Sequence, residues 1–326
     1  MKQIILSILL FCSISTFGQN EVTKIVIAIA NKKDTLSIKH FDASNNLVFL
    51  KSFPKSDNGA EIYTYLYDNS NREIRKFYFS GTYDIINYQY DTVQNIRKAF
   101  TYEYIYEDEN DFSSKKFISK IHNVKDLEET ETFKKIIKQD EYLAAITYFM
   151  DTLPVKTINF NREGDTTEII NYSYNDRNLL VSEYHHFKKT AYSMRPPLDY
   201  REVYTYDTLG KILSFGHYYL YRPMRPVFLF KYDYETPNII KVTFEGSDGK
   251  IRPDFVEEYE NDRIVKRIDY YYPLSEKKEK KSISYTVIYY EYDEENRLVR
   301  EFYSKKWKEK PLKKYRKDIE YIYKLK

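Results

Sequence analysis

Hydrophobic and polar residues alternate along most of this chain, and tyrosine fills many of the alternating positions. In segment 63–67 every second residue is tyrosine, which places three rings on one face of an extended strand. Alternation with a period of two predicts half-buried β-strands rather than helices. The alternating runs are short and are separated by polar residues, so the sequence predicts an all-β chain built from many short strands.

A recurring group of residues separates these runs. Each copy has a Tyr-Asp pair or a close variant, then a short polar gap with Asn or Gly, then a Leu or Ile that begins the next run. Asp accepts hydrogen bonds from nearby backbone amides, and Asn or Gly tolerates the left-handed conformation, so each copy predicts a tight turn of a β-hairpin. The copies are Phe41-Asp42, Tyr67-Asp68, Tyr90-Asp91, Tyr174-Asn175, Tyr206-Asp207, Tyr259-Glu260 and Tyr292-Asp293.

These copies resemble the YD repeat of the Rhs family of secreted and surface proteins. The resemblance covers most of residues 37–326 and implies a repeated hairpin that winds into a spiral β-shell; no toxin-like segment follows the last copy. Most copies lie 23–33 residues apart, enough for two strands and two connections. We therefore expect an up-and-down antiparallel meander of about nine to eleven hairpins, forming an open twisted or solenoid-like sheet.

One stretch, residues 112–147, is the least regular. Phe133, Ile136, Ile137 and Ala144 could form the apolar stripe of a helix. The alternative is another hairpin, with strands 133–138 and 142–149 around residues 139–141. The hairpin keeps the rhythm of its neighbours, and we prefer it.

The first 18 residues have the features of a secretory signal peptide. Lys2 supplies a positive charge, residues 4–11 are apolar but too short to span a bilayer, and Thr16 and Gly18 are small residues before a cleavage site preceding Gln19. The sequence thus predicts export to the periplasm, the outer surface or the medium, with residues 19–326 as one hairpin-repeat domain. Cys12 is the single cysteine, so the mature chain would have none.

Charge is unevenly placed along the chain. The formal net charge is +3, whereas residues 301–326 alone carry ten Lys or Arg against four Asp or Glu. Such a basic tail suits an anionic surface, a glycan or an acidic protein face, and export makes nucleic acid an improbable partner. The simpler interpretation is that these lysines guard the exposed edge of a terminal strand.

A basic residue followed by proline opens several of the predicted strands. In a meander, alternate connections lie at opposite ends of the strands, so the Tyr-Asp turns should share one end and these longer loops the other. Arg and Trp are the residues that most often anchor interfaces. We therefore predict a partner-binding surface at the loop end, formed by Arg195, Arg222, Arg225, Arg252, Trp307 and Lys308.

No sequence motif for catalysis, phosphate binding or metal binding is recognisable. His185 and His186 are adjacent, so on a strand they point to opposite faces and cannot bind one metal together. The acidic segment 107–111 lacks the glycine and spacing of a calcium loop. We expect no cofactor, no metal site and no catalytic residue.

The sequence therefore favours a non-enzymatic secreted or envelope-associated scaffold that holds a protein partner through its basic, proline-containing loops. One alternative is a polysaccharide-binding protein with an exposed tyrosine-rich face. A second is a hydrolase with dispersed carboxylates. Charged residues interrupt the predicted strands, as at Lys266, Arg267, Arg300 and Glu301, and this argues against a lipid-embedded barrel.

Overall fold

The computed structural model describes residues 22–30, 34–53, 61–79, 83–102, 121–137, 139–188, 198–272, 284–307 and 310–325. The predicted signal peptide and the acidic segment 107–111 lie outside these residues. The first half of the described chain contains β1 (Val22–Ala30), β2 (Asp34–Asp42), β3 (Leu47–Ser52), β4 (Glu61–Tyr67), β5 (Glu73–Phe79), β6 (Tyr83–Asp91), β7 (Ile96–Tyr102), the helices α3 (Val124–Glu128) and α4 (Glu131–Ile136), β8 (Glu141–Met150), β9 (Leu153–Phe160) and β10 (Thr166–Tyr174).

The second half consists of ten further strands in the described residues. They are β11 (Leu180–Phe187), β12 (Tyr200–Tyr206), β13 (Ile212–Tyr219), β14 (Phe228–Asp233), β15 (Ile239–Gly246), β16 (Ile251–Glu260), β17 (Arg263–Tyr271), β18 (Ser284–Tyr292), β19 (Leu298–Trp307) and β20 (Lys310–Leu325). No helix in the described residues is long and apolar enough to cross a membrane.

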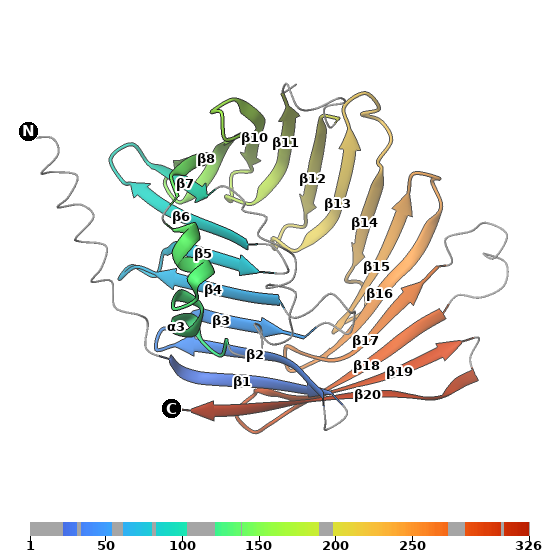
Figure 1. Cartoon of the computed structure of the whole chain (residues 1–326). Coiled ribbons are helices and arrows are strands. Elements are labelled where there is room, and N and C mark those ends of the chain that lie inside the picture. Colours follow the sequence, from blue (N-terminus) through green and yellow to red (C-terminus); the bar gives the residue numbers. More distant parts are fainter. Residues whose placement is uncertain are drawn as a thin grey trace, which may run out of the picture.

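The strands form one closed ring. Each strand pairs antiparallel with the next along the chain, as an up-and-down meander requires. β1 also pairs with β20, with Ile27 opposite Ile322, so the first and last strands join (Figure 1). The all-β meander is confirmed, but the open or solenoid-like sheet, and with it the spiral shell of the Rhs family, is wrong.

Closure also changes the interpretation of the basic tail. β20 has β19 on one side and β1 on the other, so it is not an edge strand. Its lysines therefore do not guard a free edge. The turn pattern could not reveal this, because the same hairpin fits an open sheet and a closed one. Closure depends on pairing between residues about 300 positions apart in sequence.

The predicted turn chemistry is confirmed at the Tyr-Asp copies. Asp68 accepts hydrogen bonds through Oδ1 from the backbone amides of Ser70 and Arg72, at 2.8 and 2.9 Å, and Asn71 has a φ of 57°. Asn175 and Asp207 accept two amides in the same way. Positive φ values recur at Asn45, Asn95, Asn178, Gly210 and Asn296. Asn and Asp therefore perform most of the turning, as their abundance in the copies predicted.

The irregular stretch is partly helical, and the preferred hairpin is wrong. α4 covers Glu131–Ile136, and only the second half of the predicted hairpin exists, as β8. The two helices are short and would be marginal alone, but Leu127, Phe133 and Ile136 are buried against β3–β6. Their strand partners are Phe49, Ile62, Phe77, Phe79 and Ile85. Figure 1 shows α3 lying beside these strands. Packing of the helices on the apolar patch, and not the periodicity of the sequence, decides the structure of this stretch.

Candidate functional site

The ring has two faces, and the paired registers assign each strand residue to one of them. The face that carries Tyr67, Tyr90, Tyr206 and Tyr292, together with the residues paired to them, is called the tyrosine face here. The helices cover part of the other face, where Phe77 pairs with Thr64 and Ile85. Because paired residues share a face, this assignment can be followed from strand to strand around the whole ring.

The repeated tyrosines are tied to the backbone. The hydroxyl of Tyr206, at the end of β12, donates to the Leu180 carbonyl at the start of β11, at 2.8 Å. The same bond, from the end of one strand to the start of the preceding strand, recurs with oxygen distances of 2.8–3.2 Å. It joins Tyr67 to Leu47, Tyr90 to Glu73, Tyr174 to Pro154, Tyr292 to Ile264 and Tyr323 to Leu298. These hydroxyls therefore fix the hairpins to one another.

The antiparallel order separates two ends of the ring. Connections that follow even-numbered strands, including the Tyr-Asp turns, lie at one end, called the turn end. Connections that follow odd-numbered strands lie at the other, called the loop end. Of the predicted binding residues, Arg195 and Lys308 lie outside the described residues, and Trp307 is placed only as the last residue of β19. Arg222 and Arg225 belong to the connection between β13 and β14, and Arg252 is the second residue of β16, next to the neighbouring connection between β15 and β16.

The connection between β13 and β14 is exposed and fixed by backbone bonds. Arg222 N donates to the Tyr219 carbonyl at 3.0 Å, and Arg225 N donates to the Arg222 carbonyl at 3.2 Å. Val227 N closes the loop on the His217 carbonyl at 2.7 Å. Met224 is 96% exposed at the tip, and Arg222 and Arg225 are exposed beside it. The sequence pattern singled out the arginines but not Met224, which lies between them.

Arg252 has a different role from the other two arginines. Its guanidinium forms an ion pair with Asp248 at 2.6 Å and lies over the Tyr272 ring. Asp248 is exposed; hydrogen bonds from Arg252 and from the Lys250 amide lower its pKa to about 2. Arg252 therefore shapes the connection between β15 and β16. A Cβ placed on Gly249 of that connection would lie 3.9 Å from the Arg225 guanidinium, which confirms that the two connections are neighbours.

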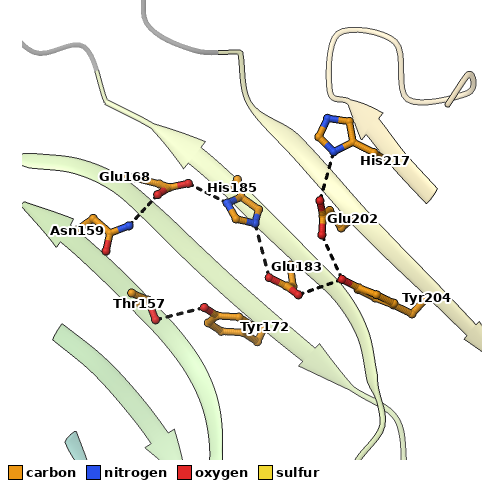
Figure 2. Close-up of polar contacts among 9 residues, drawn as sticks. All are labelled: Thr157, Asn159, Glu168, Tyr172, Glu183, His185, Glu202, Tyr204 and His217. Atoms are coloured by element: carbon orange, nitrogen blue, oxygen red, sulfur yellow. Dashed lines mark hydrogen bonds and ion pairs between the residues drawn. The ribbon is translucent and has the colours of Figure 1, made fainter. Parts of the chain in front are cut away.

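A second group of polar residues lies on the tyrosine face of β9–β13 (Figure 2). Glu168 accepts from Asn159 at 2.7 Å and contacts His185 Nδ1 at 2.8 Å. The other nitrogen of the same imidazole, His185 Nε2, lies 3.7 Å from Glu183. Tyr204 donates toward both Glu183 and Glu202, with distances of 3.2 and 3.1 Å, and Glu202 meets His217 at 3.4 Å. We call these residues the Glu–His–Tyr network.

Sequence analysis did not predict this network. Its signal was the alternation of Glu183 with His185 and of Glu202 with Tyr204, which places each pair on one face. The separation of His185 from His186 is confirmed, because His186 Nδ1 contacts Asp199 at 2.6 Å on the opposite face. No group of three or more His, Cys, Asp or Glu suited to a metal ion is found among the described residues.

Burial and the carboxylates together suppress ionisation of the network's tyrosines. Burial, followed by the charges of Glu183 and Glu202 and their hydrogen bonds, strongly raises the pKa of Tyr204. Burial and the nearby charge of Glu168 raise the pKa of Tyr200 to about 12. Both hydroxyls are therefore neutral at physiological pH, and the Tyr204 hydroxyl acts as a hydrogen-bond donor to the two carboxylates.

The aromatic rings beside the network pack against one another. Tyr200 lies between His185 and His217, with centroid distances of 4.2 and 4.4 Å. His217 continues the row onto Phe228 at 5.2 Å, and Phe230 stacks on Phe215 at 6.2 Å. A sugar ring needs a free aromatic face on which to stack. In this row the aromatic rings lie against one another. The row therefore stabilises the sheet and offers no platform for a polysaccharide.

Both faces of the sheet carry charged pairs. Arg267 bridges Glu257 and Asp269 on the tyrosine face, at 2.8 and 2.6 Å. On the other face Lys266 pairs with Glu258, and Lys231 with Glu245 at 3.4 Å. A lipid-facing surface excludes such ions, which cost about 2–4 kcal/mol each near the bilayer midplane. Neither face is a continuous apolar band in β14–β17, where these pairs lie.

Comparisons with known proteins identify no family for this chain. No protein-family model matches it, the YD repeat included, and no curated protein matches its sequence. Among solved structures, a porin-like protein from Bacteroides uniformis is similar over 95% of this chain and 99% of its own, with 9% identity and a TM-score of 0.34. We draw no functional conclusion from a likeness of this strength. The suspected membership of the Rhs family is corrected by the closed ring and by the absence of a family match.

Proposed function

We propose that this chain is an exported, envelope-associated binding protein without enzymatic activity, whose loop end holds a protein partner. The observation that carries the proposal is the exposed connection between β13 and β14. It presents Arg222, Met224 and Arg225 together at the tip of a loop held by backbone hydrogen bonds. Exposed arginine beside an exposed apolar side chain is typical of interface anchors.

Preorganisation supports the same proposal. Pro223 and Pro226 follow the two arginines and restrict φ on either side of the tip. A loop already fixed in one shape loses little conformational entropy when a partner binds. At the opposite end, the Asp side chains of the Tyr-Asp turns are used in hydrogen bonds to their own turns. The side chains at the tip of this loop are instead exposed and available to a partner.

The setting follows from export and from the charged faces. The signal-peptide features of residues 1–18 support passage out of the cytoplasm. Charged pairs on both faces of β14–β17 support a ring that stands in water, not one embedded in lipid. We therefore place the protein at the envelope with its loop end free to meet another protein.

The experiment is a cross-linking comparison in the native envelope. A photo-activatable residue replaces Met224 in one variant and Leu209 in the other; Leu209 is 80% exposed at the turn end and serves as the matched control. We expect a discrete protein adduct from position 224 and none from position 209. Adduct formation should be lost in the double variant Arg222→Glu, Arg225→Glu while thermal unfolding stays unchanged. Equal labelling from both positions, or adducts that survive the double variant, would contradict the proposal.

The two alternative functions have weaker support. Polysaccharide binding needs exposed ring faces, but the rings beside the network cover one another. A hydrolase needs carboxylates that are free to act. Glu183 and Glu202 instead share the Tyr204 hydroxyl and contact histidines, so each is already a member of a hydrogen-bonded chain.

A further inference from the structure

The loop end holds a local patch made by two adjacent connections, residues 220–227 and 246–251. Phe228, which follows the first, is paired with Gly246, which begins the second. The guanidinium of Arg225 lies beside Gly249 of the second connection, 3.9 Å from the point that a Cβ on this glycine would occupy. The two connections therefore form one continuous surface, which we call the 220/250 patch.

The patch is positively charged. Arg222, Arg225, Lys250 and the adjoining Arg252 stand against a single carboxylate, Asp248, which gives a net charge of +3. Asp248 is already paired with Arg252 at 2.6 Å and lies 3.9 Å from Lys250. Arg222 and Arg225 form no ion pair with any described residue. Charge complementarity therefore calls for an anionic ligand, and the planar guanidinium suits a carboxylate.

The patch is also apolar. Met224, Ile251 and Tyr221 are 96%, 61% and 58% exposed on the same two connections. An inorganic anion offers these side chains nothing to cover them, and a sugar ring would stack only on Tyr221 and leave Met224 and Ile251 uncovered. An acidic protein segment that carries an apolar side chain matches both properties.

A flat anionic membrane is a poorer match than a protein segment. A planar surface would touch connections all around the loop end, including the exposed acidic turn with Glu163 and Asp165 between β9 and β10. Among the loop-end connections that the structure describes in full, the positive, apolar character belongs to the two adjacent connections of the patch. A surface of this local extent fits one short segment of a partner.

We propose that the 220/250 patch binds an acidic protein segment and receives one of its apolar side chains between Met224 and Ile251. This inference rests on the proposed partner-binding function and specifies the partner's chemistry. The guanidinium groups of Arg222 and Arg225 hold the segment's carboxylates. The apolar contacts exclude water around these bonds and set the register of the segment.

The test selects short random phage-displayed peptides on the full mature chain and measures the enriched peptides in solution by fluorescence anisotropy. We expect enriched sequences to combine Asp or Glu with a large apolar residue. Their affinity should fall about tenfold or more with Arg222→Glu and Arg225→Glu combined, and several-fold with Met224→Ser and Ile251→Ser combined. Added salt should weaken binding. The controls Lys241→Glu and Val93→Ser, both exposed positions remote from the patch, should leave affinity unchanged.

Two outcomes would overturn the inference. One is enrichment of peptides without acidic residues, or of acidic peptides that bind the arginine variants as tightly as the wild-type protein. The other is patch-dependent sedimentation of the protein with phosphatidylglycerol vesicles, but not with phosphatidylcholine vesicles, when no peptide is enriched. If position 224 still cross-links a native partner whose contact segment is not acidic, the binding function stands and this inference alone is wrong. If position 224 yields no partner, the binding function itself is wrong.

Discussion

At the scale of single residues, the abundance of tyrosine has an architectural cause. The last tyrosine of a strand reaches the carbonyl at the start of the preceding strand, as Tyr206 does at Leu180. Each bond contributes about 1 kcal/mol, and repetition makes the sum large. Aspartate has the complementary role, because its carboxylate accepts the backbone amides that the turn leaves unpaired. Residues that take part neither in the tyrosine hydrogen bonds nor in the turns, such as Met224, remain available for function.

Replacing the turn aspartate Asp68 tests this assignment. Partial burial raises the pKa of Asp68, but the hydrogen bonds from the Arg72 amide and guanidinium and from the Ser70 amide outweigh it and lower the pKa below its usual value. Asp68→Ala should reduce the free energy of unfolding at neutral pH by about 1–2 kcal/mol. The exposed Asp176 accepts no hydrogen bond from described residues, so Asp176→Ala is the matched control.

The pH dependence of this effect has a defined sign. A carboxyl group whose pKa is lower in the folded state stabilises the protein above its unfolded pKa, about 3.9, and loses that contribution as pH falls through the folded value. Denaturant titrations should therefore show the difference between wild type and Asp68→Ala shrinking below about pH 4. A difference that is absent at pH 7, or that grows on acidification, would contradict the role of Asp68.

At the scale of elements, the helices show how packing overrides local pattern. α3 and α4 exist because three apolar side chains cover the patch on β3–β6. Lys51, buried within that patch, donates to the Ile121 carbonyl at 2.9 Å and so fixes the start of the helical segment. Burial lowers the pKa of Lys51, partly offset by the charge of Asp126. The helices therefore belong to the core of this side of the ring.

A truncation in the helical segment tests this dependence. Leu127 is completely buried, so Leu127→Ala should cost about 2–5 kcal/mol of local stability. Amide hydrogen exchange should become faster across residues 121–137 and stay unchanged in β14–β17 on the far side. The control Ile137→Ala removes a side chain that is 42% exposed and should change little. Unaltered exchange in 121–137 would mean that the helices do not depend on this contact.

Sequence patterns predicted what depends on neighbouring residues. Alternation gave the strands, Asp and Asn gave the turns, and the antiparallel order separated a turn end from a loop end. Features that depend on residues distant in sequence were not predicted. They are the helices, the Tyr204 hydroxyl shared by Glu183 and Glu202, and the exposure of Met224. The candidate site was therefore predicted as a region, through Arg222 and Arg225, while its apolar half was missed.

At the scale of the whole molecule, the ring gives every described strand two partners. Among the described strands no free edge remains, so a partner cannot bind by adding a strand to the sheet. Because the first and last strands close the ring, β20 must be present before β1 gains its second neighbour. Closure of the ring thus depends on pairing between the first and last described strands.

The most direct test of this account is a disulfide between β1 and β20. Ile27 and Ile322 lie directly opposite each other, within the reach of a disulfide, and the single cysteine of the sequence, Cys12, precedes the described residues. In the double variant Ile27→Cys, Ile322→Cys, mild oxidation should give an intramolecular bond in nearly every folded monomer. The control Ile27→Cys, Leu213→Cys, on strands far apart in the ring, should not form one. Failure of the first pair to cross-link in folded monomers would contradict the closed ring.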